Sequence, residues 1–225
     1  MPAALVLFDI DGTLLRKAGP QHRRALEVAV QQVTSVPVTT DGIATQGMLD
    51  RDIVTLMLRR AGVRVRGIRG FMPQIVERAQ QVYHETCPDL RDRVCPGAAE
   101  LLQQLHGAGA VIGLVTGNFT LIGWKKMERA GLRSYFRFGA FAEMGSTRSA
   151  LVRIAVRQAR REAWIGRGSR ITLIGDHQND INAALRNRIQ SVAVATGLSS
   201  LEELALCGPH QLVPDLCHLG LDTLL

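Results

Sequence analysis

The chain has 225 residues, of which 46% are hydrophobic and 21% are charged, and this composition is typical of a globular protein with a sizeable core. It contains no apolar run near the ~20 residues that a membrane-spanning helix needs, and its first residues lack the pattern of a secretory signal. We therefore expect a cytoplasmic protein that does not bind membranes. Its length suits one domain with an insertion, or two small domains.

The net charge of +7 comes mainly from arginines that are scattered over several expected helices. Aromatic residues make up only 4% of the chain and do not alternate with the basic ones, so the pattern favours a solvated arginine-rich surface over a nucleic-acid site, and the positive charge suits an anionic substrate. The cysteines form no C-x-x-C pair, which indicates reduced structural thiols and not a zinc site or a disulfide framework. They are Cys87, Cys95, Cys207 and Cys217.

The first apolar run, residues 4–8, is typical of a buried strand, and Gly12 turns the chain soon after it. Apolar residues at helical spacing then predict three helices, over 21–33, 51–61 and 70–87. Asp50 has the position and the residue type of an N-cap for the second of them. No strand pattern interrupts residues 16–92, so this segment is expected to be a helical insertion after the first strand.

From Val94 onward, strand and helix patterns alternate along the chain. The expected strands cover residues 110–115, 138–142, 171–174, 192–195 and 211–213. The expected helices cover residues 97–107, 119–130, 148–163, 180–186 and 199–206. This alternation predicts an α/β fold in which a parallel sheet has helices on both faces.

Two carboxylates, Asp9 and Asp11, come directly after the first expected strand. In open α/β sheets, ligands bind at the carboxyl ends of the strands. Two acids this close repel each other unless a cation or a shared proton relieves them, which favours a functional role. A calcium-binding loop is an alternative, but its twelfth position would be Pro20 where such loops need glutamate.

Polar residues also follow the strand at 110–115, where Thr116, Gly117 and Asn118 provide donors for phosphate oxygens. The same three residue types are also common in ordinary turns. A basic residue, Arg148, begins a later expected helix, where its charge would balance a nucleophile and a bound phosphate. Lys125 is the alternative candidate for this basic role.

Asp176 and Asp180 follow the strand at 171–174. Helix capping would account for Asp180 but not for Asp176, which lies at the strand end. Four aspartates gathered at one sheet edge would repel strongly unless they bind a hard cation. Oxygen ligands of this kind favour Mg²⁺.

In this order, the motifs resemble those of the haloacid dehalogenase-like hydrolase superfamily. They are Asp9-Ile10-Asp11-Gly12-Thr13, Thr116-Gly117-Asn118, the basic Arg148, and Gly175-Asp176 with Asp180. The resemblance covers the whole chain. It implies a Rossmann-like catalytic core formed by residues 1–15 and 93–225, with a helical cap domain at residues 16–92.

The resemblance also implies roles for individual residues. Asp9 would attack phosphorus as the nucleophile, and Asp11 would act as the general acid and then as the general base. Mg²⁺ would be bound by Asp9, by the backbone carbonyl of Asp11 and by Asp176, with support from Asp180. The phosphoryl group would be held by Thr116, Gly117 and Asn118, and its charge would be neutralised by Arg148.

The pattern is most similar to phosphoglycolate phosphatase-like members, so we expect a Mg²⁺-dependent phosphatase of a small phosphorylated metabolite, with phosphoglycolate as a candidate. The alternatives are a β-phosphoglucomutase-like phosphomutase of the same fold, a nucleic-acid phosphatase or binding protein, and a regulatory module. Thr13 favours the phosphatase, because similar mutases commonly have an aliphatic residue there. A monomer or a homodimer is expected. Four cap arginines are candidates for binding a substrate carboxylate, namely Arg51, Arg64, Arg66 and Arg69.

Overall fold

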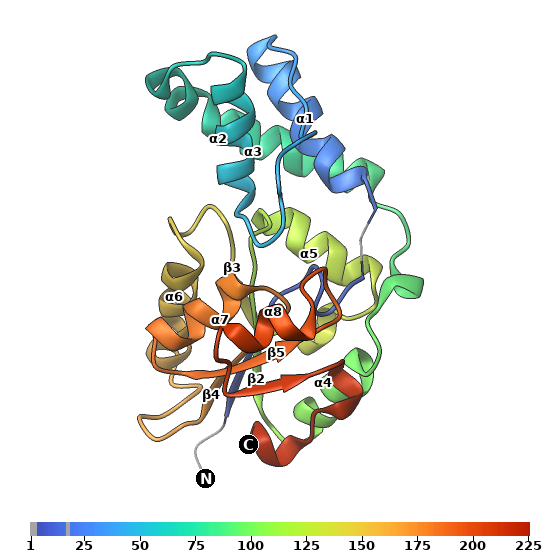
Figure 1. Ribbon diagram of the computed structural model, residues 1–225, viewed down its shortest axis with the longest axis vertical. Helices are drawn as coiled ribbons and strands as arrows, with labels where there is room; N and C mark the ends of the chain where they lie inside the picture. Colours follow the sequence, from blue (N-terminus) through green and yellow to red (C-terminus); the bar gives the residue numbers. More distant parts are fainter. Residues whose placement is uncertain (1–3, 17–18) are drawn as a thin grey trace.

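The computed structural model describes residues 4–16 and 19–225 and contains a six-stranded, all-parallel sheet with the order β3-β2-β1-β4-β5-β6 (Figure 1). Its strands are β1 (Leu5–Phe8), β2 (Val111–Val115), β3 (Phe138–Ala140), β4 (Ile171–Gly175), β5 (Gln190–Val194) and β6 (Gln211–Val213). The predicted α/β fold is confirmed, and the first strand lies at the centre of the sheet. Phe8 pairs with Leu114 on one side and with Ile174 on the other, so β1, β2 and β4 end at one level.

Helices cover both faces of this sheet. They are α4 (Ala98–Gly107), α5 (Thr120–Arg129), α6 (Arg148–Arg161), α7 (Gln178–Arg186) and α8 (Leu201–Leu206). Leu5 and Leu7 of β1 belong to a core cluster with Leu151 of α6, whereas Val6 and Phe8 belong to a second cluster on the other face. Because both faces are buried, the strand is a continuous apolar run without polar alternation.

Three further helices lie beyond the carboxyl ends of the strands (Figure 1). They are α1 (Gln21–Thr34), α2 (Asp50–Arg60) and α3 (Val65–Thr86). The two segments that connect this helical group to the sheet run side by side, since Leu15 forms an antiparallel bridge with Val94. The Cys95 N–H also donates to the Leu14 carbonyl at 2.9 Å.

Among the three helices of the helical group, two start at other residues than predicted. Asp50 is the first residue of α2 and not its N-cap, which is Leu49. The Asp50 carboxylate instead accepts hydrogen bonds from outside its own helix. The third helix begins at Val65 and not at Gly70, and the added turn is stabilised by Ile68, which is buried in the core. Gly67 and Gly70 lower the helix propensity of this turn but do not prevent it.

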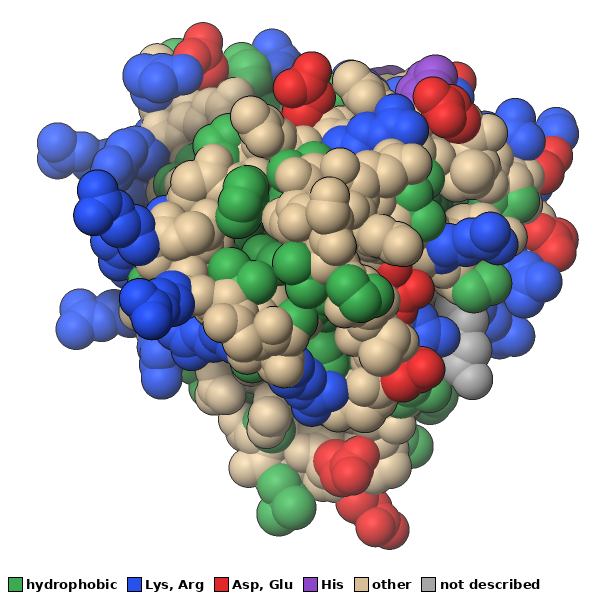
Figure 2. Space-filling model, turned by 90° about the horizontal axis from the view of Figure 1, so that it is seen from above, with side chains coloured by type: hydrophobic (Ala, Val, Ile, Leu, Met, Phe, Trp, Pro, Cys, Tyr) green, Lys and Arg blue, Asp and Glu red, His purple; other side chains and the backbone are tan. Residues whose placement is uncertain are grey.

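The surface at the helical end has basic side chains around its margin and apolar side chains nearer its centre (Figure 2). This distribution does not form the continuous basic band that would track a nucleic-acid backbone across this face. Within residues 4–16 and 19–225, the helices are all too short or too polar to cross a membrane.

Candidate active site

Three buried aspartates meet at the carboxyl edge of the sheet. Asp9 follows β1, Asp176 follows β4, and Asp180 lies in the first turn of α7. Their carboxylate oxygens lie within 4.8 Å of one another. Asp9 and Asp176 are brought to the same level by the pairing of Phe8 with Ile174. The expected convergence of these acids is therefore present, and we call Asp9, Asp176 and Asp180 the aspartate triad.

The raised carboxyl pKa values in the aspartate triad indicate that a bound cation would stabilise it. Burial raises the pKa of Asp176, and the charges of Asp9 and Asp180 raise it further. Burial also raises the pKa of Asp180, with Arg148 opposing the rise and Asp9 adding to it. Both carboxylate oxygens of Asp180 are buried without a hydrogen-bond partner. Buried carboxylates in this state fit a hard divalent cation with oxygen ligands, such as Mg²⁺.

Arg148 is the positive residue next to the triad. Its Nη1 donates to Asp9 Oδ1 at 2.8 Å and to the Val115 carbonyl at 3.2 Å. Its Nε lies 3.2 Å from Asp180 Oδ1. Burial alone would lower the pKa of this guanidinium, but the charges of Asp180 and Asp9 hold it above its ordinary value. One positive charge beside three carboxylates leaves an excess negative charge, which again suits a divalent cation.

The Asp11 side chain lies outside the aspartate triad and is held by a lysine. Lys126 Nζ lies 2.7 Å from Asp11 Oδ1 and 2.6 Å from Oδ2, and Asn118 Nδ2 donates to Oδ2 at 2.8 Å. Burial alone raises the pKa of Asp11, but the charges of Lys126 and His22 and the hydrogen bonds from Lys126 and Asn118 together outweigh this effect, and the pKa is lowered. The Lys126 side chain has no exposed surface, whereas Lys125, the alternative in the sequence, forms a helix-surface ion pair with Glu128.

A histidine from the helical group continues this network. Lys126 Nζ lies 3.1 Å from His22 Nδ1, and because an ammonium group only donates, Nδ1 is the acceptor. The other ring nitrogen, Nε2, therefore carries a hydrogen and donates to Asp50 Oδ2 at 2.9 Å. The same Asp50 oxygen accepts the Phe119 N–H at 2.8 Å. The chain of contacts from Asp11 to Asp50 thus joins the sheet edge to α1 and α2.

The predicted phosphate-binding residues follow β2. Asn118 donates its backbone N–H to Thr116 Oγ1 at 3.3 Å and its Nδ2 to the same atom at 2.8 Å. The Gly117 carbonyl accepts the Asp50 N–H at 2.8 Å. A side chain at Gly117 would place its Cβ 2.2 Å from the Met48 carbonyl oxygen, so only glycine allows this approach. Gly117 and Asn118 line the cavity above the triad, whereas Thr116 is buried beneath it.

Gly12 makes the turn between the two acids and the helical group compact. Its φ is 91°, in the left-handed region that favours glycine. A Cβ at this position would lie 2.1 Å from Asp176 Oδ2. Thr13 then donates its hydroxyl to Asp176 Oδ1 at 3.2 Å. In the turn after Asp11, Gly12 therefore leaves space for the Asp176 carboxylate, and Thr13 orients that carboxylate by a hydrogen bond.

A cavity of about 470 Å³ lies between the sheet edge and the helical group. Asp9, Asp11, Asp176 and Arg148 line it from the sheet side, and His22 lines it from α1. This volume is in the range of small-molecule sites. Three arginines also line the cavity, namely Arg16, Arg23 and Arg93. None of the four arginines named in the sequence as candidates for binding a substrate carboxylate is among the residues that line this cavity.

Metal removal gives the first testable prediction. The raised pKa values of Asp176 and Asp180 mean that the metal-free folded chain holds protons that the unfolded chain releases. This contribution to stability is complete below about pH 4, the ordinary carboxyl range, and is lost as the pH rises through the folded pKa values. We therefore expect the melting temperature in EDTA to fall as the pH rises from about 4 and to level off above about pH 8, the higher of the two folded pKa values.

Mg²⁺ should raise the melting temperature most at the alkaline end, where the carboxylates are ionised. A free concentration a hundredfold above Kd stabilises by about 2.7 kcal/mol. Differential scanning calorimetry with and without Mg²⁺ measures both effects. The Asp176→Asn variant is the control, because it removes one carboxylate and should lose most of the Mg²⁺ effect. An equal Mg²⁺ effect in both proteins would contradict a metal site at the triad.

Comparison with known proteins agrees with this geometry. A family model described as haloacid dehalogenase-like hydrolase matches residues 3–187. A phosphoglycolate phosphatase from Synechococcus elongatus is 26% identical over 212 residues, which is 92% of this chain and 91% of that protein. A phosphoglycolate phosphatase from Caulobacter vibrioides is 28% identical over 198 residues, which is 86% of this chain and 80% of that protein. The crystal structure of CbbY from Rhodobacter sphaeroides in complex with phosphate has a TM-score of 0.72 at 20% identity, and the match covers 99% of each chain.

Proposed function

Because this chain belongs to the haloacid dehalogenase-like hydrolase family and is phosphatase-like, we propose that it is a Mg²⁺-dependent phosphatase of a small phosphorylated metabolite. The observation that supports this most is the placement of two acids at the floor of one cavity. Asp9 belongs to the aspartate triad. Asp11 lines the same cavity but contacts Lys126 and Asn118 instead. Two carboxylates in different environments suit two different roles in one reaction.

We also propose that residues 1–15 and 93–225 form the catalytic core and residues 16–92 a cap. Two hydrogen bonds between the proposed cap and the proposed core support this arrangement. The Asp50 N–H donates to the Gly117 carbonyl at 2.8 Å, and Asn179 Nδ2 donates to the Gly47 carbonyl at 2.8 Å. The cap therefore rests on the loops that carry the proposed site, where it limits entry of water and of large substrates.

In the first proposed step, an Asp9 carboxylate oxygen attacks the phosphorus of the substrate. The bond from phosphorus to Asp9 forms as the ester bond to the leaving oxygen breaks, which gives an aspartyl-phosphate. Asp11 in its protonated form gives its proton to the leaving oxygen. Thr116, Gly117, Asn118 and Arg148 are proposed to hold the phosphoryl oxygens and to offset their charge.

In the second proposed step, the ionised Asp11 takes a proton from water, and the water oxygen attacks phosphorus. The bond from phosphorus to Asp9 breaks, inorganic phosphate leaves, and the Asp9 carboxylate is restored. The contact with Lys126 favours the ionised form of Asp11 that this step needs. The first step needs the protonated form, so substrate binding must weaken the hold of Lys126 on Asp11.

A bound Mg²⁺ would be held by Asp9, the Asp11 carbonyl and Asp176, with Asp180 in support, and it would neutralise charge on the phosphoryl group. The three acids of the triad fit such an ion, and among the described residues no group donates a hydrogen bond to the Asp180 carboxylate. Arg148 orients Asp9 by donating to its Oδ1, which leaves the other carboxylate oxygen free of this contact.

Phosphoglycolate is the substrate that we propose first, on the similarity to the two phosphoglycolate phosphatases. The cavity of about 470 Å³ is small, and Arg16, Arg23 and Arg93 give its lining a positive charge. A compact substrate with a phosphate and a carboxylate would place the phosphate at the triad and the carboxylate among these arginines.

The test of this function is a screen of phosphorylated metabolites that includes 2-phosphoglycolate and several sugar phosphates, each with Mg²⁺. Release of inorganic phosphate that stops in EDTA is the expected result. Interconversion of sugar phosphates without net phosphate release would favour the phosphomutase instead. An absence of both reactions across the screen and on an aryl phosphate would overturn the enzymatic proposal.

Arg148→Ala gives the second testable prediction. Removing the guanidinium leaves Asp9 and Asp180 without their buried counter-charge. We expect turnover of an aryl phosphate to fall by about 10-fold to 100-fold, because one of several charge-stabilising groups at the phosphoryl oxygens is lost. Steady-state kinetics at saturating Mg²⁺ measures this, and Arg148→Lys should recover part of the loss. Unchanged turnover in Arg148→Ala would exclude this role.

A further inference from the structure

A second cavity lies at the opposite end of the sheet from the aspartate triad. Ile171 is the first residue of β4 and lines this cavity, whereas Asp176 follows the last residue of the same strand. The cavity has a volume of about 640 Å³. Half of its lining residues are arginines, namely Arg153, Arg157, Arg160, Arg167, Arg170 and Arg188. Its lining, taken from the described part of the chain, includes no aspartate or glutamate.

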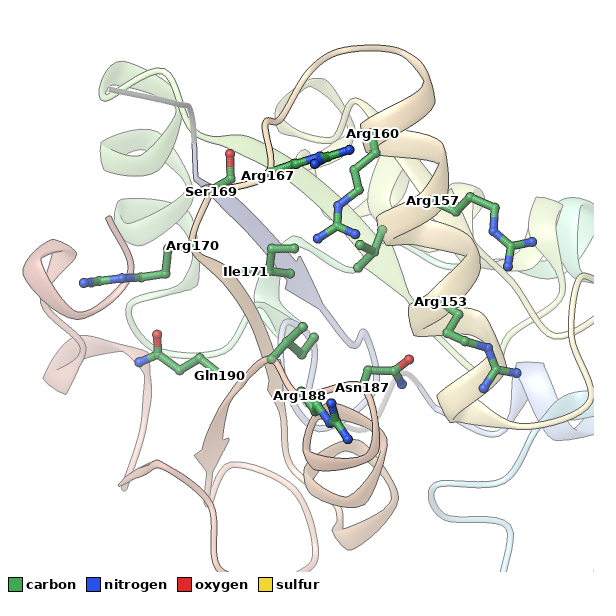
Figure 3. A pocket seen from close by; sticks show the side chains of 12 residues that line it. Arg153, Arg157, Arg160, Arg167, Ser169, Arg170, Ile171, Asn187, Arg188 and Gln190 are labelled. Carbon is green, nitrogen blue, oxygen red and sulfur yellow. The ribbon is translucent and has the colours of Figure 1, made fainter.

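The arginines of this cavity differ in where they point. Arg167 of the loop after α6 extends towards that helix, and Arg160 of α6 extends into the cavity towards Ile171 (Figure 3). Arg153 and Arg157 extend along the outer side of α6, so they border the cavity and do not fill it (Figure 3). Arg170 is turned away, and its Nη1 donates to the Asp222 carbonyl at 3.0 Å. The guanidinium groups of Arg160 and Arg167 therefore define the centre of the site.

Three of these arginines lack an acidic partner among the described residues. Across residues 4–16 and 19–225, Arg160, Arg167 and Arg188 form no ion pair with an acid. By contrast, Arg161, the neighbour of Arg160 on α6, is paired with Glu162 at 2.9 Å. Like charges around one cavity repel, and an anion bound among them offsets that repulsion.

Two features of this arrangement have an energetic cost. Arg153, Arg157 and Arg160 are spaced four and three residues apart on α6, and like charges at these spacings destabilise a helix. Arg188 has a φ of 55°, in the left-handed region where glycine is favoured over arginine. Both features are unfavourable without a ligand, and both place guanidinium groups around the same cavity.

We propose that this cavity binds a small anion with several linked phosphates through Arg160, Arg167 and Arg188. The planar guanidinium group donates paired hydrogen bonds that match phosphate oxygens. Several linked phosphates match several guanidinium groups better than a single phosphate does. The cavity lining has no aromatic side chain on which a base could stack, so recognition is directed at the phosphate chain. That chain is supplied either by an inorganic polyphosphate or by a nucleotide.

The test is binding of inorganic triphosphate to the full chain, measured by isothermal titration calorimetry. We expect the double variant Arg160→Gln/Arg167→Gln to weaken binding by about tenfold or more, because it removes charge-assisted hydrogen bonds. The matched control is Arg161→Gln, which changes a paired arginine on the same helix outside the cavity and should change affinity by less than about twofold. Equal losses in both proteins, or no loss in the double variant, would overturn the proposal.

Arg188→Gly is a second variant that separates binding from folding. Glycine suits the left-handed backbone at this position, so the melting temperature should not fall. Triphosphate affinity should nevertheless fall, because one guanidinium is lost from the rim. A variant that is as stable as the wild type and binds triphosphate equally well would count against the proposed site.

Other ligands distinguish the sources of the phosphate chain. ATP binding that equals triphosphate binding supports a nucleotide, and weaker ATP binding supports an inorganic polyphosphate. Orthophosphate that binds as tightly as triphosphate, or duplex DNA that binds more tightly, would overturn the proposal. Hydrolysis of an aryl phosphate should be unchanged in all these variants, because their substitutions lie at the far end of β4 from the triad. Failure of the proposed phosphatase activity would leave this binding test intact.

Discussion

Asp9→Asn is expected to lower the turnover of an aryl phosphate by about 10⁴-fold or more. The asparagine amide has nearly the shape of the carboxylate but is not a nucleophile, so the aspartyl-phosphate cannot form. Its Oδ1 can still accept the hydrogen bond that Arg148 donates to Asp9 at 2.8 Å. The fold should therefore be retained. Phosphate release measures turnover, and mass spectrometry of acid-quenched protein measures whether a phosphoryl group becomes attached.

The control for this prediction is Asp222→Asn, which makes the same chemical change at an exposed position outside the active-site cavity. This variant should keep wild-type turnover and wild-type phosphorylation. Retention of more than about a tenth of wild-type turnover by Asp9→Asn would show that another group attacks phosphorus. Loss of the phosphorylated protein together with loss of turnover is the pair of results that identifies Asp9 as the nucleophile.

The fold could be predicted because its signals are local. The central strands β1, β2 and β4 are short apolar runs that end at glycine or polar residues, and the helices have their own apolar spacing. A parallel sheet then brings all strand ends to one edge, so Asp9, Thr116 and Asp176 had to lie near one another. The helix boundaries were less predictable, as Val65 shows. Burial of Ile68 favours the helix there, despite two glycines that disfavour it.

The residues that the sequence analysis missed depend on contacts between distant segments. His22 and Asp50 meet across 28 positions, and Lys126 meets Asp11 across 115 positions. One local signal did exist, because Ile122 and Met127 lie on the buried side of α5 and Lys126 falls on the same side. A lysine within an apolar stripe predicts either a buried ion pair or a functional group. No local pattern indicated that its partner would be Asp11.

Lys126→Met tests the role of the buried lysine in catalysis. Methionine fills much of the volume of this fully buried side chain, but it leaves the Asp11 carboxylate without its ion-pair partner, so stability should also fall and turnover must be measured on protein shown to be folded. Turnover should fall by about 10²-fold to 10³-fold, because general acid–base catalysis by a positioned carboxylate contributes about 10² to 10⁴. Asp11 loses the contact that orients both of its oxygens and that favours the ionised form.

The pH dependence identifies the cause of this loss. In the wild type, the charge of Lys126 makes the largest of the contributions that together outweigh burial and lower the pKa of Asp11. Without that charge the effect of burial remains, so the pKa of Asp11 rises. The acidic limb of the kcat profile, where ionised Asp11 is needed, should move to higher pH.

Lys125→Met is the matched control, because it removes the same charge from the adjacent position, where the lysine pairs with Glu128. It should change neither turnover nor the pH profile. A lower turnover in Lys126→Met with an unshifted acidic limb would mean that Lys126 positions Asp11 without controlling its protonation. Equal effects of the two substitutions would mean that the charge of α5 acts at long range, and that the contact between Lys126 and Asp11 has no separate role in catalysis.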